Sequence, residues 1–212
     1  MKQYVTYLFD ADGTLLDTSE LIFQSFYHTC RTHGGFEVDR ETIFKDVGIP
    51  LKVQLIKLLG EMSPEELEAV IETHRSYQKT IYEMTLRLYG GVKEGLVKLK
   101  ERGARLGIVT SRNRESLDTY LKHTGIDRLF EVVASPEDTA NHKPHPEPVL
   151  WAMKQFGSEP DSTVFVGDAV FDILSGNAAG VDTALITWGH NDPEDIEAEP
   201  TWVIHDFNDL LS

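Results

Sequence analysis

The most constraining feature of this sequence is a short apolar run that ends in two acidic residues. The run Tyr4–Phe9 is rich in β-branched and aromatic residues and predicts a buried strand. Asp10 and Asp12 follow it, and residues with this spacing point to the same side of an extended chain. Two buried anions need a cation or a shared proton. The pair therefore indicates a hard metal ion such as Mg²⁺ or an acid/base pair, although an ordinary Asp-rich turn is also compatible with the segment.

Further apolar runs along the chain have the same strand-like composition. Helical patterns separate most of them, and this alternation predicts a mainly parallel sheet with helices on both faces. The expected strands span residues 4–10, 105–110, 130–134, 163–167, 182–186 and 201–204. The predicted fold class is α/β, a doubly wound, Rossmann-like sheet.

The interval between the first two expected strands is about 95 residues, far longer than an ordinary βαβ crossover. Most of it reads as helix. Asp17 is the expected cap of a first helix, Leu51–Leu59 forms a second, and Ser63 opens a third with a capping box. Because these helices share no strand with the sheet, we expect them to form an inserted cap domain. The expected boundaries are 17–87 for the helical cap domain, and 1–16 with 88–212 for the core domain.

Polar residues also follow other expected strands. Thr110, Ser111 and Arg112 come directly after the second strand, where Thr-Ser is also a routine helix start. Asp168 follows the strand at 163–167, and Asp172 lies one helical turn further on. At the carboxyl edge of an open α/β sheet, such residues are placed where ligands bind.

Lys143 stands in a proline-rich segment between these motifs. Pro144, Pro146 and Pro148 follow it, and we expect them to hold its backbone in an extended path. A surface lysine is usually only solvated. A lysine held rigidly between two acidic motifs favours a role in neutralising a buried carboxylate and a bound anion.

The order of these elements is an acidic pair, a hydroxyl, a lysine and a second acidic pair. This order resembles the four motifs of the haloacid-dehalogenase-like hydrolase superfamily, over the whole chain. The branch to which the chain is most similar contains phosphoglycolate phosphatases, a pyrophosphatase and β-phosphoglucomutases. The resemblance implies a phosphatase that acts on small phosphorylated metabolites, uses Mg²⁺, and forms an aspartyl-phosphate. Phosphoglycolate phosphatase is the nearest specific label.

The resemblance also implies roles for the first motif. Asp10 is the nucleophile and a metal ligand. Asp12 protonates the leaving group and then activates water, and its backbone carbonyl ligates the metal. Thr14 either supports this loop or simply caps the turn.

For the second and third motifs, the resemblance implies phosphate binding. Thr110 hydrogen-bonds the phosphoryl group, with the backbone N–H of Ser111 beside it. The branch more often has Thr-Asn-Lys here, so the assignment of Ser111 and Arg112 to substrate binding is left open by this departure. Lys143 neutralises Asp10 and the transferring phosphate.

In the fourth motif, Asp168 is implied as the second carboxylate ligand of Mg²⁺. Asp172 holds Lys143 or a metal-bound water, or is an acidic residue favoured by the helix dipole. Relatives carry Ser or Thr after the first aspartate, where this chain has Ala169.

One loop of the expected cap is also a candidate for substrate binding. Gly48 and Lys52 flank a helix start in the position where related enzymes lower a specificity loop onto the substrate. Backbone N–H groups at that start, together with Lys52, could bind a second anionic group. The alternative is a simple helix cap with a solvated lysine.

Composition excludes several partners and compartments. The 212 residues include 35 acidic and 20 basic side chains, a net charge of −15, which argues against nucleic-acid or anionic-membrane binding. No apolar stretch approaches the ~20 residues of a membrane span, and no signal peptide is expected, so the predicted location is cytoplasmic. Cys30, the only cysteine, is expected to be a packed core thiol. A monomer or a homodimer is expected.

Other activities are possible on similar motifs. A phosphosugar mutase or an inorganic pyrophosphatase remains the alternative to a phosphatase. A haloacid dehalogenase or a phosphonatase lacks the second acidic residue, so Asp12 argues against both, although Lys52 could serve the phosphonatase reaction. A phospho-accepting signalling module places its aspartate later in the chain and has no helical insertion.

Overall fold

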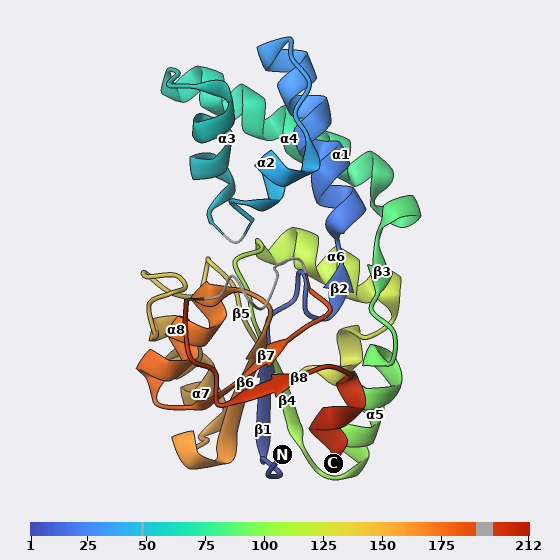
Figure 1. Cartoon of the computed structure of the whole chain (residues 1–212), viewed down its shortest axis with the longest axis vertical. Helices are drawn as coiled ribbons and strands as arrows, with labels where there is room; N and C mark the ends of the chain where they lie inside the picture. The colour runs from blue at the N-terminus through green and yellow to red at the C-terminus, as the bar shows by residue number, and fades with distance from the viewer. Residues whose placement is uncertain (48, 190–196) are drawn as a thin grey trace. The chain divides into compact units, whose positions relative to one another are not determined.

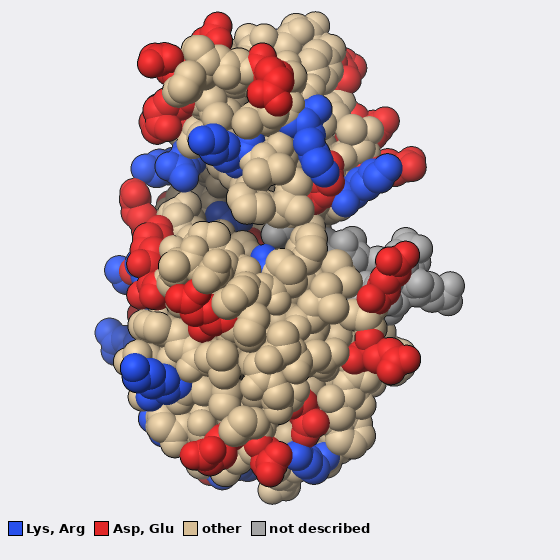
Figure 2. Space-filling model, turned by 90° about the vertical axis from the view of Figure 1, so that its left-hand side faces the viewer, with Lys and Arg blue, Asp and Glu red and all other residues tan. Residues whose placement is uncertain are grey.

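The computed structural model describes residues 1–47, 49–189 and 197–212 (Figure 1). The chain divides into two compact units, Met1–Asp17 with Arg87–Ser212, and Thr18–Leu86. Among the described residues, no helix combines the length and the apolar character needed to cross a membrane. On the face drawn in Figure 2, acidic side chains lie in several groups, so the net charge of −15 forms no single patch there.

The larger unit is built on a six-stranded sheet whose neighbouring strands are all parallel. The strand order is β5-β4-β1-β6-β7-β8. Its strands are β1 (Thr6–Phe9), β4 (Arg105–Val109), β5 (Val132–Ala134), β6 (Thr163–Gly167), β7 (Asp182–Ile186) and β8 (Trp202–Ile204). The predicted doubly wound α/β fold is therefore confirmed, and every expected strand is present with its ends shifted by two residues at most.

Helices cover both faces of this sheet because successive residues of β1 point to opposite sides. Leu8 packs in an apolar cluster with Phe156 of α7 (Glu147–Phe156). Phe9 stacks on Phe207, with ring centroids 5.9 Å apart. Other helices of this unit include α5 (Val92–Glu101), α6 (Arg114–Thr124), α8 (Val170–Ala179), η2 (Asp127–Leu129), η3 (Pro160–Ser162) and η5 (Phe207–Leu211).

The smaller unit is helical. It contains α1 (Ser19–Thr29), the π-helical turn η1 (Cys30–Gly34), α2 (Arg40–Phe44), α3 (Leu51–Leu59) and α4 (Pro64–Thr85). The capping box predicted at Ser63 is confirmed, since its hydroxyl accepts from the Glu66 N–H and the Glu66 carboxylate accepts from the Ser63 N–H. Cys30 is fully buried in the apolar core of this unit, as expected.

The expected cap at Asp17 is wrong. Thr18 occupies the N-cap position of α1, and Asp17 lies in the short strand β2 (Leu16–Asp17). This strand pairs antiparallel with β3 (Arg87–Leu88), so the chain leaves and re-enters the larger unit on neighbouring strands. Two-residue strands carry no periodicity, which is why the sequence did not predict them.

Candidate active site

Three of the strand-end motifs meet because β1 lies between β4 and β6. Phe9, the last residue of β1, pairs with Ile108 on one side and Val166 on the other. Asp10, Thr110 and Asp168 therefore leave the sheet at the same carboxyl edge, and all three are buried. In an open parallel sheet, this edge forms the ligand-binding crevice.

The ammonium group of Lys143 lies between two carboxylates. Its Nζ donates to Oδ1 of Asp10 and to Oδ1 of Asp172, at 2.6 Å in both cases. Only 6% of the Lys143 side chain is exposed, with 8% for Asp10 and 1% for Asp172. Burial lowers the pKa of Lys143, but the two carboxylates outweigh it, so the pKa is raised and the lysine stays charged.

Asp172 is itself held at the start of α8. Its Oδ2 accepts a hydrogen bond from the backbone N–H of Ala169 at 3.0 Å. The carboxylate thus bonds the helix N-terminus with one oxygen and Lys143 with the other. The sequence suggested that Asp172 either holds Lys143 or is an acidic residue at a helix N-terminus, and its contacts include both.

The segment that carries Lys143 is not extended, which corrects the expectation from its prolines. Residues 143–144 form a turn and residues 145–146 a bend, and Pro146 has helical angles of φ −71° and ψ −15° at the start of α7. The carboxylate of Glu147 accepts hydrogen bonds from the backbone N–H groups of Ala140 and Asn141. These hydrogen bonds tie the residues before Lys143 to the start of α7.

Three carboxylates at this edge lie close enough to share a cation. One oxygen each of Asp10, Asp168 and Asp172 lies within 4.8 Å of the others. Burial is the main cause that raises the pKa of Asp10 well above its usual range; Lys143 opposes this shift and the other carboxylates add to it. Among the described residues, Lys143 forms salt bridges with Asp10 and Asp172, and Arg112 forms one with Asp12.

Three buried carboxylates with oxygens this close together provide the oxygen donors that a hard divalent cation such as Mg²⁺ prefers. Asp10 and Asp168 are the residues that would hold it, because Asp172 is already bonded at both oxygens. The proposed contribution of the Asp12 backbone carbonyl stays a prediction. Thr14 supports the site through its hydroxyl, which donates to Oδ1 of Asp168 at 3.3 Å.

Two glycines close around Asp168. A Cβ on Gly13, which has φ +81°, would lie 2.3 Å from Oδ2 of Asp168, and a Cβ on Gly189 would lie 2.3 Å from the Asp168 Cβ. The neighbouring Trp188 donates its indole N–H to the carbonyl of Thr14 at 3.2 Å. The sequence analysis missed Trp188 and Gly189; the only available signal was their position just after the expected strand at 182–186.

Arg112 contacts Asp12 in this structure. Its Nε donates to Oδ2 and its Nη2 to Oδ1 of Asp12, both at 2.8 Å. The hydroxyl oxygen of Thr110 accepts a hydrogen bond from the backbone N–H of Arg112 at 3.1 Å. The Thr110 O–H can therefore still donate a hydrogen bond to another group. Ser111 is exposed. The substrate-binding roles of Ser111 and Arg112 stay predictions.

The structure describes only one of the two candidate substrate-binding residues of the smaller unit. Lys52 is exposed in the first turn of α3, and its contact with substrate stays a prediction. Gly48 lies outside the described residues.

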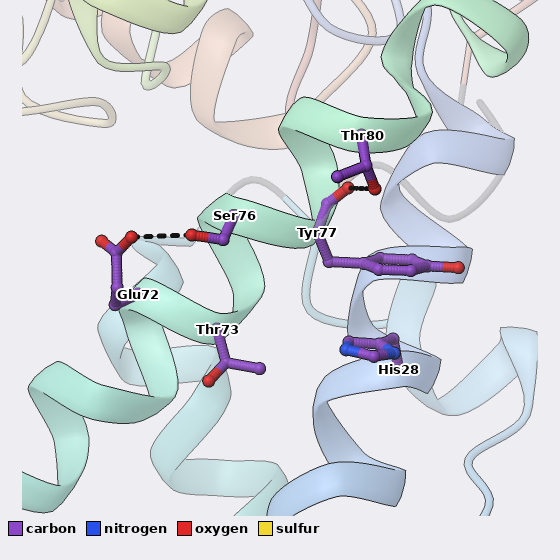
Figure 3. A pocket seen from close by; sticks show the side chains of 6 residues that line it. All are labelled: His28, Glu72, Thr73, Ser76, Tyr77 and Thr80. Atoms are coloured by element: carbon purple, nitrogen blue, oxygen red, sulfur yellow. Dashed lines mark hydrogen bonds between the residues drawn. The ribbon is translucent and has the colours of Figure 1, made fainter.

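The smaller unit also has a surface hollow of about 420 Å³ between α1 and α4 (Figure 3). In it, the ring of His28 stacks on Tyr77 at a centroid distance of 3.9 Å, and Ser76 donates to Glu72. The hollow is lined by His28, Glu72, Thr73, Ser76, Tyr77 and Thr80. These residues belong to the smaller unit, whereas the strand-end motifs belong to the larger one.

Comparison with known proteins bears out the resemblance. Residues 7–186 match the profile of the haloacid dehalogenase-like hydrolases. The chain is 37% identical over 208 residues to the pyrophosphatase PpaX of Bacillus pumilus, covering 98% of this chain and 94% of that protein. It is 36% identical to the PpaX of Halalkalibacterium halodurans, with 97% and 94% covered.

A solved structure agrees over the full length. The crystal structure of a predicted phosphoglycolate phosphatase from Haemophilus somnus superposes with a TM-score of 0.92 and 27% identity, covering 100% of this chain and 98% of that one. Family profile, relatives and fold agree, and the prediction from the motif order is confirmed: this chain is an enzyme of the haloacid dehalogenase-like hydrolase family.

Proposed function

We propose that the chain is a Mg²⁺-dependent phosphatase for small phosphorylated molecules that works through an aspartyl-phosphate on Asp10. The observation that carries the proposal is the Lys143 ammonium, bonded to Asp10 and Asp172 at 2.6 Å beside the buried Asp168. A carboxylate is a competent nucleophile toward phosphorus once the charge of the phosphoryl group is offset. Lys143 supplies part of that positive charge without leaving the site.

The steps follow from the positions of these side chains. A carboxylate oxygen of Asp10 forms a bond to phosphorus while the bond to the leaving oxygen breaks, and Asp12 gives that oxygen a proton. Asp12 then takes a proton from water, which attacks phosphorus and releases Asp10 and phosphate. Thr110 donates its hydroxyl to a phosphoryl oxygen, next to the backbone N–H of Ser111. A bound Mg²⁺ would offset charge on the phosphoryl oxygens.

We further propose that the larger unit is the catalytic core and that the smaller unit is a cap that sets substrate selectivity. The strand-end motifs all belong to the larger unit, which supports this division. In this proposal, the loop of Gly48 and the side chain of Lys52 bind the part of the substrate that is not transferred.

Removal of divalent metal is expected to stop the reaction and to lower stability. EDTA should abolish hydrolysis of p-nitrophenyl phosphate, and Mg²⁺ should restore it. The melting temperature should rise when Mg²⁺ is added to metal-free protein, because a cation that binds only the folded state stabilises that state. Full activity in chelator, with no change in melting temperature, would rule out the metal assignment.

The substrate is proposed to carry a second anionic group. The resemblance of the motifs points to phosphoglycolate as the substrate. The name pyrophosphatase, which two of the relatives carry, points instead to inorganic diphosphate. A panel of phosphorylated metabolites that contains both compounds should give the highest kcat/KM for one of these two. Equal kcat/KM values for every compound in the panel would contradict both substrate proposals but would leave the phosphatase proposal intact.

A further inference from the structure

Two loop segments of the larger unit pack directly against Asp168, which is proposed above as a metal ligand. A Cβ on Gly13 would lie 2.3 Å from Oδ2 of Asp168, and a Cβ on Gly189 would lie 2.3 Å from its Cβ and 2.7 Å from its Oδ2. A side chain at either position would therefore overlap Asp168, which is only 2% exposed. The backbones of the two segments thus limit the positions that the Asp168 side chain can adopt.

A hydrogen bond from Trp188 joins these two segments. Its indole N–H donates to the backbone carbonyl of Thr14 at 3.2 Å, and the hydroxyl of Thr14 donates to Oδ1 of Asp168 at 3.3 Å. Thr14 is fully buried, so water does not compete strongly for these bonds. Both segments therefore contact Asp168 and are also bonded to each other.

The apolar core holds Trp188 in turn. Its ring centroid lies 6.5 Å from that of Phe207, and Phe207 stacks on Phe9 of β1 at 5.9 Å. Phe207 is only 2% exposed. Trp188 therefore connects the surroundings of Asp168 to the strand that leads into Asp10, the other proposed metal ligand.

We propose that Trp188 and Gly189 are positioning residues that hold Asp168 in the geometry needed to bind Mg²⁺. The inference rests on the function proposed above, in which Asp168 is a metal ligand. Trp188 fixes the segment whose Thr14 hydroxyl bonds Asp168, and Gly189 lets the backbone approach closely. Mg²⁺ requires near-octahedral coordination, so displacing one carboxylate weakens its binding. Groups that orient a metal ligand in this way typically account for about 10–100-fold in metal affinity.

The test measures Mg²⁺ binding to the metal-free, full-length enzyme by titration calorimetry, without substrate. Trp188→Phe keeps an aromatic ring but removes the N–H, and it should raise the Kd for Mg²⁺ about 10-fold. Gly189→Ala keeps the indole but places a methyl group against Asp168, and it should raise the Kd by at least the same factor. The Mg²⁺ concentration that gives half-maximal hydrolysis of p-nitrophenyl phosphate should rise in parallel.

Each variant has a matched control in the same unit. Trp202→Phe also removes an indole hydrogen bond, which Trp202 donates to the hydroxyl of Tyr4 at 2.8 Å. Gly90→Ala adds a methyl group at a position where no described residue beyond the chain neighbours lies within 4 Å. Neither control should change the Kd for Mg²⁺. The melting temperature of the metal-free protein reports any loss of stability separately from the loss of metal affinity.

An unchanged Kd for Mg²⁺ in either Trp188→Phe or Gly189→Ala would overturn the positioning role of the residue replaced, even if the melting temperature of that variant fell. An equal rise of Kd in the controls would overturn both roles. If Trp188→Phe does not fold, Gly189→Ala decides the test. An unmodified enzyme that binds no Mg²⁺ would instead refute the metal assignment in the proposed function, and this inference with it.

Discussion

Replacing Asp10 by asparagine is expected to abolish turnover and leave the fold intact. The amide has the same shape as the carboxylate but cannot form the aspartyl-phosphate, so kcat should fall by more than roughly 10³-fold. Because burial raises the pKa of Asp10, removing its charge relieves a cost of folding, and the melting temperature of metal-free protein should not fall. Steady-state hydrolysis of p-nitrophenyl phosphate and a thermal melt measure the two effects.

The matched control for this substitution is Asp161→Asn, which changes an exposed aspartate in η3 and should leave both quantities unchanged. If Asp10→Asn keeps more than a few per cent of the activity, the covalent route is wrong. Loss of activity together with loss of the folded state would require a second nucleophile variant, Asp10→Ser, before the role of Asp10 is judged.

Lys143→Met should impair both catalysis and stability. Removing the ammonium leaves Asp10 and Asp172 buried side by side without their common cation, which should lower the free energy of unfolding by about 3–5 kcal/mol. The loss of positive charge beside the transferring phosphate should lower kcat by about 10²–10³-fold. Urea unfolding and steady-state kinetics measure these effects.

Lys154→Met is the control for Lys143→Met, because Lys154 is exposed on α7 in the same unit. It should match the unmodified protein in both measurements. A Lys143→Met variant with unchanged stability and activity would show that the ammonium is not required between these carboxylates. In that event, Lys143 would not have the role of offsetting the charge of Asp10 and Asp172.

The strands and their order of motifs could be predicted from the sequence because both depend on local patterns. Each apolar run is short, each is followed by a turn, and parallel strands bring their carboxyl ends to one edge. For this reason Asp10, Thr110 and Asp168 were expected to meet, and the structure brings them together. The capping box at Ser63 and the helix at Leu51–Leu59 depend on equally local signals.

The contacts that the sequence did not predict join residues far apart in the chain. The bond from Arg112 to Asp12 spans 100 positions and depends on a rotamer, which no motif specifies. The approach of Gly189 to Asp168 depends on how a loop returns to the site. The turn at Lys143 was misjudged because its prolines indicated an extended path, whereas the anchor at Glu147 lies in the next helix.

The most direct test of the central claim is to trap the phosphorylated enzyme. Asp12→Asn enzyme with Mg²⁺ is mixed with radiolabelled p-nitrophenyl phosphate, quenched in acid and digested, because loss of the general base should slow hydrolysis of the intermediate. We predict acid-stable label in the one peptide that contains Asp10, and no label in Asp10→Asn/Asp12→Asn enzyme. Product release at the same rate with no label on the protein, or label on a peptide without Asp10, would contradict the account.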